Sequence, residues 1–158
     1  MNEYMKIAKE LSEENLTTNN GGPFGACIVK NGEIIGRGAN HVLKHNDPTA
    51  HAEIEAIRDA CKNIGSYDLS GCELFTSCYP CPMCLSAIIW ANIKEVYYGN
   101  TKEDAENIGF RDAFIYEFLD KLAKGNSDKN TLDLECMDRD ETIEVFNKYK
   151  EKQDKTIY

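Results

Sequence analysis

The chain has 158 residues, of which 42% are hydrophobic and 28% are charged, and this composition is typical of one globular domain with a buried core. Its formal net charge of −9 disfavours a nucleic-acid partner, because an acidic surface repels phosphate backbones. No apolar run is long enough to cross a membrane, no secretion signal is visible, and seven cysteines in such a chain indicate reduced thiols, so we expect a cytoplasmic protein.

The first expected elements in chain order are a helix and a hairpin. Apolar side chains at helical spacing between residues 4 and 11 predict an amphipathic helix, and GGPFG at 21–25 ends it. Two short apolar runs, 26–30 and 33–38, flank Asn31-Gly32, a dipeptide that favours a tight hairpin turn. A polar loop with two histidines, His41 and His45, follows, and we expect both to be exposed to solvent.

The rest of the chain alternates between strand and helix patterns. We expect helices at 51–64, 83–92, 101–107, 113–123 and 140–152, and strands at 72–77, 94–100 and 131–136. This alternation predicts an α/β sandwich, in which strands joined by crossover helices usually run parallel.

Two short motifs carry the candidate chemistry, and each opens a predicted helix. His51-Ala52-Glu53 and Pro80-Cys81-Pro82-Met83-Cys84 together match the H-x-E and P-C-x-x-C signature of zinc deaminases. His51, Cys81 and Cys84 supply three nitrogen and sulfur ligands and leave the fourth position of a tetrahedral zinc ion to water. Thiolates are also stabilised at helix N-termini, where the helix dipole is positive.

Glu53 follows the first of these ligands by two positions. A carboxylate beside zinc-bound water accepts its proton and passes it to a ring nitrogen. The pattern therefore predicts one zinc ion held by His51, Cys81 and Cys84, with Glu53 as the catalytic residue of a hydrolytic deaminase.

Other interpretations of the cysteine motif stay open. A C-x-x-C pair that opens a helix also fits a thiol–disulfide redox protein. A structural zinc site would take Cys78 as its fourth ligand. An iron–sulfur site is disfavoured, because Ile88 occupies the position where a ferredoxin pattern has its next cysteine.

Longer stretches of the sequence carry a family resemblance. They are GGPFGACIVKNG (21–32), NDPTAHAEIEAIRDAC (46–61), TSCYPCPMC (76–84), GFRDAFIY (109–116) and the final Tyr158. With these, the chain resembles the cytidine deaminase-like superfamily, and more closely the small zinc-dependent guanine deaminases of bacteria. The resemblance implies a three-layer α/β/α sandwich around a mixed five-stranded sheet, and the hydrolysis of guanine to xanthine and ammonia. It also implies one deaminase domain over 1–158 and a homodimer in which a tail at about 153–158 is swapped.

The resemblance also implies four contacts to a small-molecule base, at Phe24, Asn40, Asp112 and Tyr158. Purely structural roles are the alternatives: a core aromatic for Phe24, a turn asparagine for Asn40, a helix N-cap for Asp112 and a frayed chain end for Tyr158.

Two positions depart from the family pattern. Tyr79 stands where many relatives have glutamate, and Arg111 stands where they often have an acidic residue. These departures leave open other substrates of the superfamily, namely cytosine, an aminotriazine, guanosine or the adenosine of a tRNA.

Overall fold

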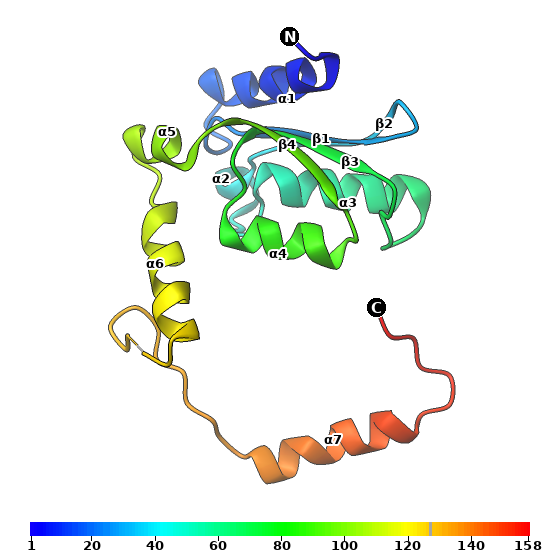
Figure 1. Ribbon diagram of the computed structural model, residues 1–158. Helices are drawn as coiled ribbons and strands as arrows, with labels where there is room; N and C mark the ends of the chain where they lie inside the picture. The colour runs from blue at the N-terminus through cyan, green and yellow to red at the C-terminus, as the bar shows by residue number, and fades with distance from the viewer. Residues whose placement is uncertain (127) are drawn as a thin grey trace. The chain divides into compact units, whose positions relative to one another are not determined.

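A mixed sheet of four strands organises the first part of the computed structural model, which describes residues 1–126 and 128–158 (Figure 1). The chain separates into two units, Met1–Tyr116 and Glu117–Tyr158, and the sheet belongs to the first unit. The spatial order of its strands is β2-β1-β3-β4. Their bounds are Gly25–Lys30 for β1, Glu33–Ala39 for β2, Glu73–Cys78 for β3 and Glu95–Asn100 for β4.

Strand directions follow from the connections. The hairpin makes β1 and β2 antiparallel, and Asn31 and Gly32 at its turn both have positive φ, as the Asn-Gly signal predicts. The crossover through a helix makes β3 and β4 parallel, as expected. Since β1 is antiparallel to both β2 and β3, these two strands end at the same edge of the sheet.

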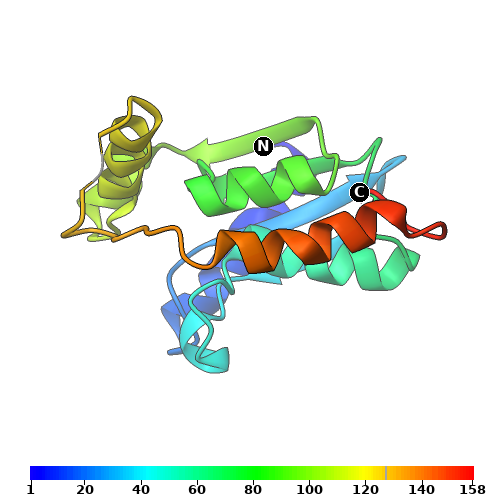
Figure 2. The same cartoon turned by 90° about the horizontal axis from the view of Figure 1, so that it is seen from below.

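Helices cover both faces of the sheet, so the predicted three-layer arrangement is confirmed (Figure 1). Helix α1 (Glu3–Glu13) packs on one face over Cys27, Val29 and Phe75. Helices α3 (Ala52–Ile64) and α4 (Pro82–Trp90) cover the other face and run side by side (Figure 2). Neighbouring residues of β1, such as Ile28 and Val29, therefore enter different cores, as the two-residue period of a strand requires.

Shorter elements complete the chain. They are the 3-10 turn η1 (Glu14–Leu16) and the helices α2 (Val42–His45), α5 (Lys102–Asn107), α6 (Asp112–Ala123) and α7 (Arg139–Glu151). The helices expected at 101–107, 113–123 and 140–152 are thus present. In the part of the chain that the structure describes, no helix combines the length and the apolarity needed to cross a membrane.

The prediction of a fifth strand at 131–136 is wrong. The described residues contain four strands, and this segment has no strand partner. Its leucines, Leu132 and Leu134, are 49% and 63% exposed. An alternating apolar pattern yields a strand only where a neighbouring strand pairs with its backbone, and here none does.

Close packing of β2 against α3 fixes the position of the helix that carries the first motif. A Cβ atom on Gly38 would lie 2.1 Å from the carbonyl oxygen of Ala52 and 2.4 Å from the nitrogen of Ala56. Ala52, Ala56 and Ala60 are fully buried along the contact. Because both surfaces lack bulky side chains, the backbones of strand and helix approach closely.

We expect Gly38→Ala to lower the free energy of unfolding by about 2–3 kcal/mol, because the new methyl group meets backbone atoms that cannot turn aside. Urea unfolding of the zinc-loaded protein measures the change. Arg37→Ala, on the exposed neighbouring residue, is the control and should change stability little. Equal stability of the two variants would show that the strand–helix contact is not tight.

Candidate metal centre and active site

The N-terminal turns of α3 and α4 meet beside the ends of β2 and β3. His51 is the N-cap of α3 and Cys81 is the N-cap of α4, and both have extended backbone angles. Pro82 occupies the first turn of α4, where its missing N–H costs no hydrogen bond. Both motifs therefore begin helices, as the sequence predicts, and their side chains point into one space.

Three ligand atoms converge there. His51 Nδ1 lies 3.6 Å from Cys81 Sγ and 3.7 Å from Cys84 Sγ. All three ligand atoms lie within 4.8 Å of one another. A tetrahedral zinc ion with its usual bond lengths separates a nitrogen and a sulfur ligand by about 3.6 Å. The three side chains thus fit a zinc ion in both chemistry and spacing.

The charges of the cluster also suit a cation. The hydrogen bond from the Cys84 thiol lowers the pKa of Cys81 well below its ordinary value, which favours the thiolate form. The same hydrogen bond, together with burial, raises the pKa of Cys84 far above its ordinary value. The hydrogen bond to Cys81 raises the pKa of His51. Without a metal the cluster holds protons, which a zinc ion would displace.

Glu53 lies next to these ligands on the first turn of α3. Only 6% of the residue is exposed. Its Oε1 atom accepts a hydrogen bond from Thr76 Oγ1 at 3.0 Å, and its Oε2 atom accepts one from Cys84 Sγ at 3.3 Å. Burial raises the pKa of the Glu53 carboxyl. A carboxyl group with a raised pKa is suited to accept and return a proton near neutral pH.

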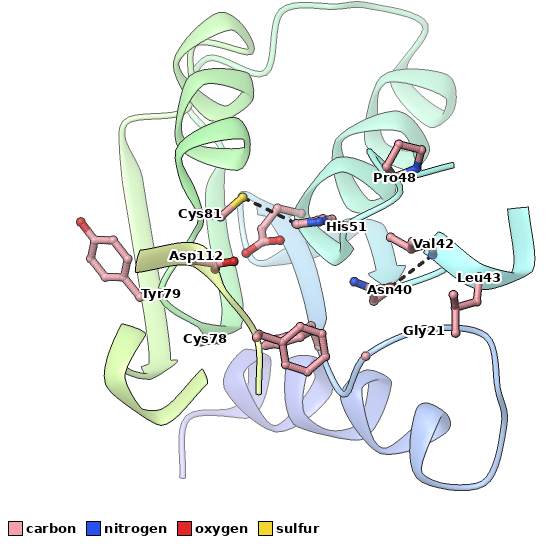
Figure 3. A pocket seen from close by; sticks show the side chains of 14 residues that line it. Gly21, Asn40, Val42, Leu43, Pro48, His51, Cys78, Tyr79, Cys81 and Asp112 are labelled. Atoms are coloured by element: carbon pink, nitrogen blue, oxygen red, sulfur yellow. Dashed lines mark hydrogen bonds between the residues drawn. The ribbon is translucent and has the colours of Figure 1, made fainter. Parts of the chain in front are cut away.

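A cavity of about 380 Å³ opens above the cluster. His51, Glu53 and Cys81 lie on its lining, together with the sequence-predicted contacts Phe24, Asn40 and Asp112 (Figure 3). This volume is within the range of pockets for small molecules. Sequence reasoning missed other lining residues: Gly21, Gly22, Val42, Leu43, Pro48, Cys78 and Phe110.

Two of the predicted contacts have defined partners in the cavity wall. The ring of Phe24 meets that of Phe110 edge to face, with centroids 4.7 Å apart. Asn40 is buried, and its Oδ1 atom accepts a hydrogen bond from the Val42 N–H, which turns its amide nitrogen towards the cavity (Figure 3). The wall thus offers one aromatic face and one polar donor.

The other two predicted contacts differ from each other. Asp112 borders the cavity at the start of α6, and burial raises the pKa of its carboxyl (Figure 3). Tyr158 belongs to the second unit, and the residue is 80% exposed.

Cys78 and Tyr79 also border this cavity, but both have other partners. Cys78 Sγ donates a hydrogen bond to the Thr101 carbonyl at 3.4 Å, and burial raises its pKa to about 11. Burial therefore favours the neutral thiol, which is hydrogen-bonded outside the ligand group. The ring of Tyr79 points away from His51 and Cys81 and lies 5.0 Å from that of Tyr98 (Figure 3).

Thr76 is a functional residue that sequence reasoning missed. It lies inside β3, where the sequence indicates only a strand residue. Its partner Glu53 is 23 positions away in the chain. A threonine in a β-rich run is ordinary, so no local signal marks it.

Comparison with known proteins places this geometry in a family. Residues 1–100 match the family model described as the cytidine and deoxycytidylate deaminase zinc-binding region. The chain belongs to this family. In this chain, the zinc site of that family is formed by His51, Cys81 and Cys84.

Guanine deaminases match most or all of this chain, in sequence and in structure. The guanine deaminase of Bacillus subtilis is 54% identical over 121 residues, which are 77% of this chain and 78% of that protein. A solved structure of guanine deaminase from Bacillus subtilis covers 100% of this chain and 99% of that chain, with 45% identity and a TM-score of 0.90.

Other relatives match a smaller part of the chain. The tRNA-specific adenosine deaminase of Aquifex aeolicus is 46% identical over 76 residues, which are 48% of this chain and 50% of that protein. A further solved structure, of a protein in complex with 2,6-diaminopurine, is 35% identical to this chain, with a TM-score of 0.65, and the match covers 69% of this chain and 61% of that chain.

We expect Cys84→Ala to lose the bound zinc, because the variant removes one of only three protein ligands. Cys78→Ala is the matched control, since it removes another buried thiol of the same motif. Zinc content per chain after dialysis, measured by mass spectrometry, distinguishes them. Loss of zinc from Cys78→Ala, or its retention by Cys84→Ala, would contradict the assignment of ligands.

Proposed function

We propose that this protein is a zinc-dependent guanine deaminase, which hydrolyses guanine to xanthine and ammonia. The observation that carries the proposal is the position of Glu53. Its buried carboxyl group lies beside the three zinc ligands on the lining of a cavity of small-molecule size. A proton carrier at this place is what the exchange of an amino group for water requires.

The proposed reaction divides the work between the metal and the chain. Zinc, when bound by His51, Cys81 and Cys84, supplies the activation of water as a nucleophile near neutral pH. Glu53 accepts the proton of the attacking water and gives it to a ring nitrogen next to the carbon that bears the amino group. Thr76 holds one carboxyl oxygen of Glu53, so that the other stays directed at the ligands. Glu53 then passes the remaining hydroxyl proton of the added water to the amino nitrogen, so that the carbon–nitrogen bond breaks, ammonia leaves and a carbonyl group forms on the ring.

The cavity wall supports the binding of a flat, polar base. The ring of Phe24 offers an aromatic face for stacking, and Phe110 holds that ring edge to face. The amide of Asn40 offers a hydrogen bond to a ring or carbonyl acceptor. Asp112 offers a carboxyl group that can receive the amino hydrogens of the base or the leaving ammonia. These three roles are proposed from position and chemistry.

Guanine is favoured over the other substrates of the family by the extent of the likeness. In structure, the match to a guanine deaminase covers 100% of this chain with a TM-score of 0.90, whereas the match to a tRNA:A34 deaminase covers 63% of it with a TM-score of 0.60. A net charge of −9 also opposes binding of a polyanion such as tRNA. Cytosine, an aminotriazine and guanosine are kept as competing substrates.

A redox or structural-zinc protein is a weaker alternative. Cys78 would be the fourth ligand of a structural zinc site, but its thiol donates a hydrogen bond to the Thr101 carbonyl. A redox pair needs neither the imidazole of His51 between the two sulfur atoms nor the buried carboxyl group of Glu53.

We further propose that the chain acts as one deaminase domain in a cytoplasmic homodimer, with its last residues, 153–158, donated to the partner's site. All seven cysteines are thiols, which agrees with a reducing compartment. Ile89 and Trp90 at the end of α4 are 72% and 66% exposed, and exposed large apolar side chains are typical of a subunit interface. Tyr158 would then close the site of the other subunit.

We expect Glu53→Gln to bind zinc normally and to lose about 10³-fold in turnover, because glutamine cannot carry a proton. Ammonia release from guanine, guanosine, cytosine, adenine and an aminotriazine by the zinc-loaded wild type is measured in parallel. Guanine should be the preferred substrate of the panel. Full activity of Glu53→Gln would remove Glu53 from the reaction, and preference for another member would overturn the choice of guanine.

The donated tail is tested by mixing two impaired chains, Glu53→Gln with an intact tail and a chain that lacks residues 155–158. If the tail acts across a symmetric dimer, random exchange of subunits should restore about a quarter of the wild-type rate. A tail that acts within its own chain would restore none. Full activity of the truncated chain alone would show that the tail is dispensable.

A further inference from the structure

A second group of metal-ligating side chains lies outside the site described above. It consists of His41, His45 and Glu55, whose ligand atoms lie within 4.8 Å of one another. Glu55 Oε2 is 3.6 Å from His41 Nδ1 and 3.7 Å from His45 Nδ1. The reaction proposed for Glu53 uses none of these residues.

The spacing of these atoms suits a tetrahedral transition-metal ion. Ligands at the usual zinc–nitrogen and zinc–oxygen bond lengths are separated by about 3.3–3.5 Å. The observed separations exceed this range by a few tenths of an ångström, which a small rotation of an exposed side chain removes. Two histidines and one glutamate are also an established ligand set for zinc, with a fourth position left to water.

Local structure brings the two imidazole groups together. Residues 42–45 form α2 instead of the open polar loop expected from the sequence, and His45 N–H donates to the His41 carbonyl at 2.9 Å. Residues four apart in such a turn share one face. The two rings lie with their centroids 5.1 Å apart. A hydrogen bond from His41 N–H to the Ala50 carbonyl, at 2.9 Å, ties this turn to the chain just before α3.

The glutamate is oriented from its other side. Arg58 Nη1 donates to Glu55 Oε1 at 2.7 Å, and this leaves Oε2 directed at the histidines. Asp47 also contacts Arg58, at 3.4 Å, so two carboxylates surround one guanidinium group. Hydrogen bonds of this kind to the second oxygen of a ligating carboxylate are usual at metal sites. The side chains of His41, His45 and Glu55 are 20%, 42% and 16% exposed, so an ion can reach them from solvent.

We propose that His41, His45 and Glu55 form a second binding site for a divalent transition-metal ion, of which Zn²⁺ is the representative. The ion links α2 to the first half of α3. Val42 and Leu43 of α2 border the cavity, and α3 carries Glu53. Metal bound here therefore fastens part of the cavity wall to the catalytic helix and stabilises the folded first unit. The site stands independently of the substrate proposed above.

The composition of the chain simplifies the test. The protein has three histidines, and His51 belongs to the first site, so a further nitrogen-ligated metal must involve His41 or His45. Cys136 is exposed and is replaced by serine in the parent and in every variant, so that its thiol does not capture metal. The starting material is the holoprotein with one equivalent of zinc.

Titration of this holoprotein with Zn²⁺, followed by calorimetry, should show one further equivalent and a rise in the thermal midpoint. His45→Ala and Glu55→Gln should each weaken this second equivalent at least tenfold and abolish the rise, while the first zinc is retained. Lys44→Ala is the matched control on the exposed face of α2 and should bind like the parent. In a parallel NMR titration, the ring signals of His41 and His45 should shift with Zn²⁺ and remain fixed in Glu55→Gln.

Two outcomes would overturn the proposal. One is the absence of a second equivalent in the parent, which would leave the cluster as side-chain contacts between Glu55 and the two imidazoles. The other is an undiminished second equivalent in both His45→Ala and Glu55→Gln, which would place the metal elsewhere.

Discussion

The buried Glu53 carboxyl group is the constraint on which the rest of the site depends. An isolated carboxylate in a protein interior costs several kcal/mol, and it persists only with partners. Here the hydrogen-bond partners come from two other elements, Thr76 from β3 and Cys84 from α4, while Glu53 itself lies on the first turn of α3. The site is therefore possible only if the first turns of both helices meet at the end of β3.

Backbone packing sets that meeting point. The positions of Gly36 and Gly38 in β2 have no room for a side chain against α3. The face of α3 that packs there consists of small alanine side chains. Pro82, within the cysteine motif, begins α4 shortly after β3 ends at Cys78, so the position of the strand also fixes the position of Cys84. Small residues that take no part in the reaction thus determine whether the three ligand atoms lie at zinc-binding distances.

The sequence predicts the parts of this arrangement that depend on local pattern. The spacing within two short motifs predicts the zinc ligands and the catalytic carboxylate, His51, Cys81, Cys84 and Glu53, because residues in the first turn of a helix have a fixed geometry relative to one another. The Asn31-Gly32 turn and the helices that flank the sheet follow from similarly local rules. Thr76 and Phe110 could not be found in this way, because their roles come from contacts between distant segments. The prediction of a fifth strand is wrong for the same reason, because a strand requires a partner strand that its own residues do not specify.

The two histidines of α2 illustrate a further limit. A polar stretch with two histidines predicts exposed side chains, and only the fold shows that one turn of helix aligns them and that Glu55 faces both. Tyr79 shows the opposite case. Its departure from the family pattern suggests altered substrate choice, yet its ring turns away from the ligands towards Tyr98 (Figure 3).

The central claim is that the zinc ion of the first site has three protein ligands and one position left for water. X-ray absorption at the zinc edge, on protein loaded with one equivalent per chain, tests it most directly. The account predicts two sulfur ligands at about 2.3 Å and two lighter ligands at about 2.0–2.1 Å. Three sulfur ligands and one nitrogen would instead place Cys78 on the metal, make the site structural, and contradict the account.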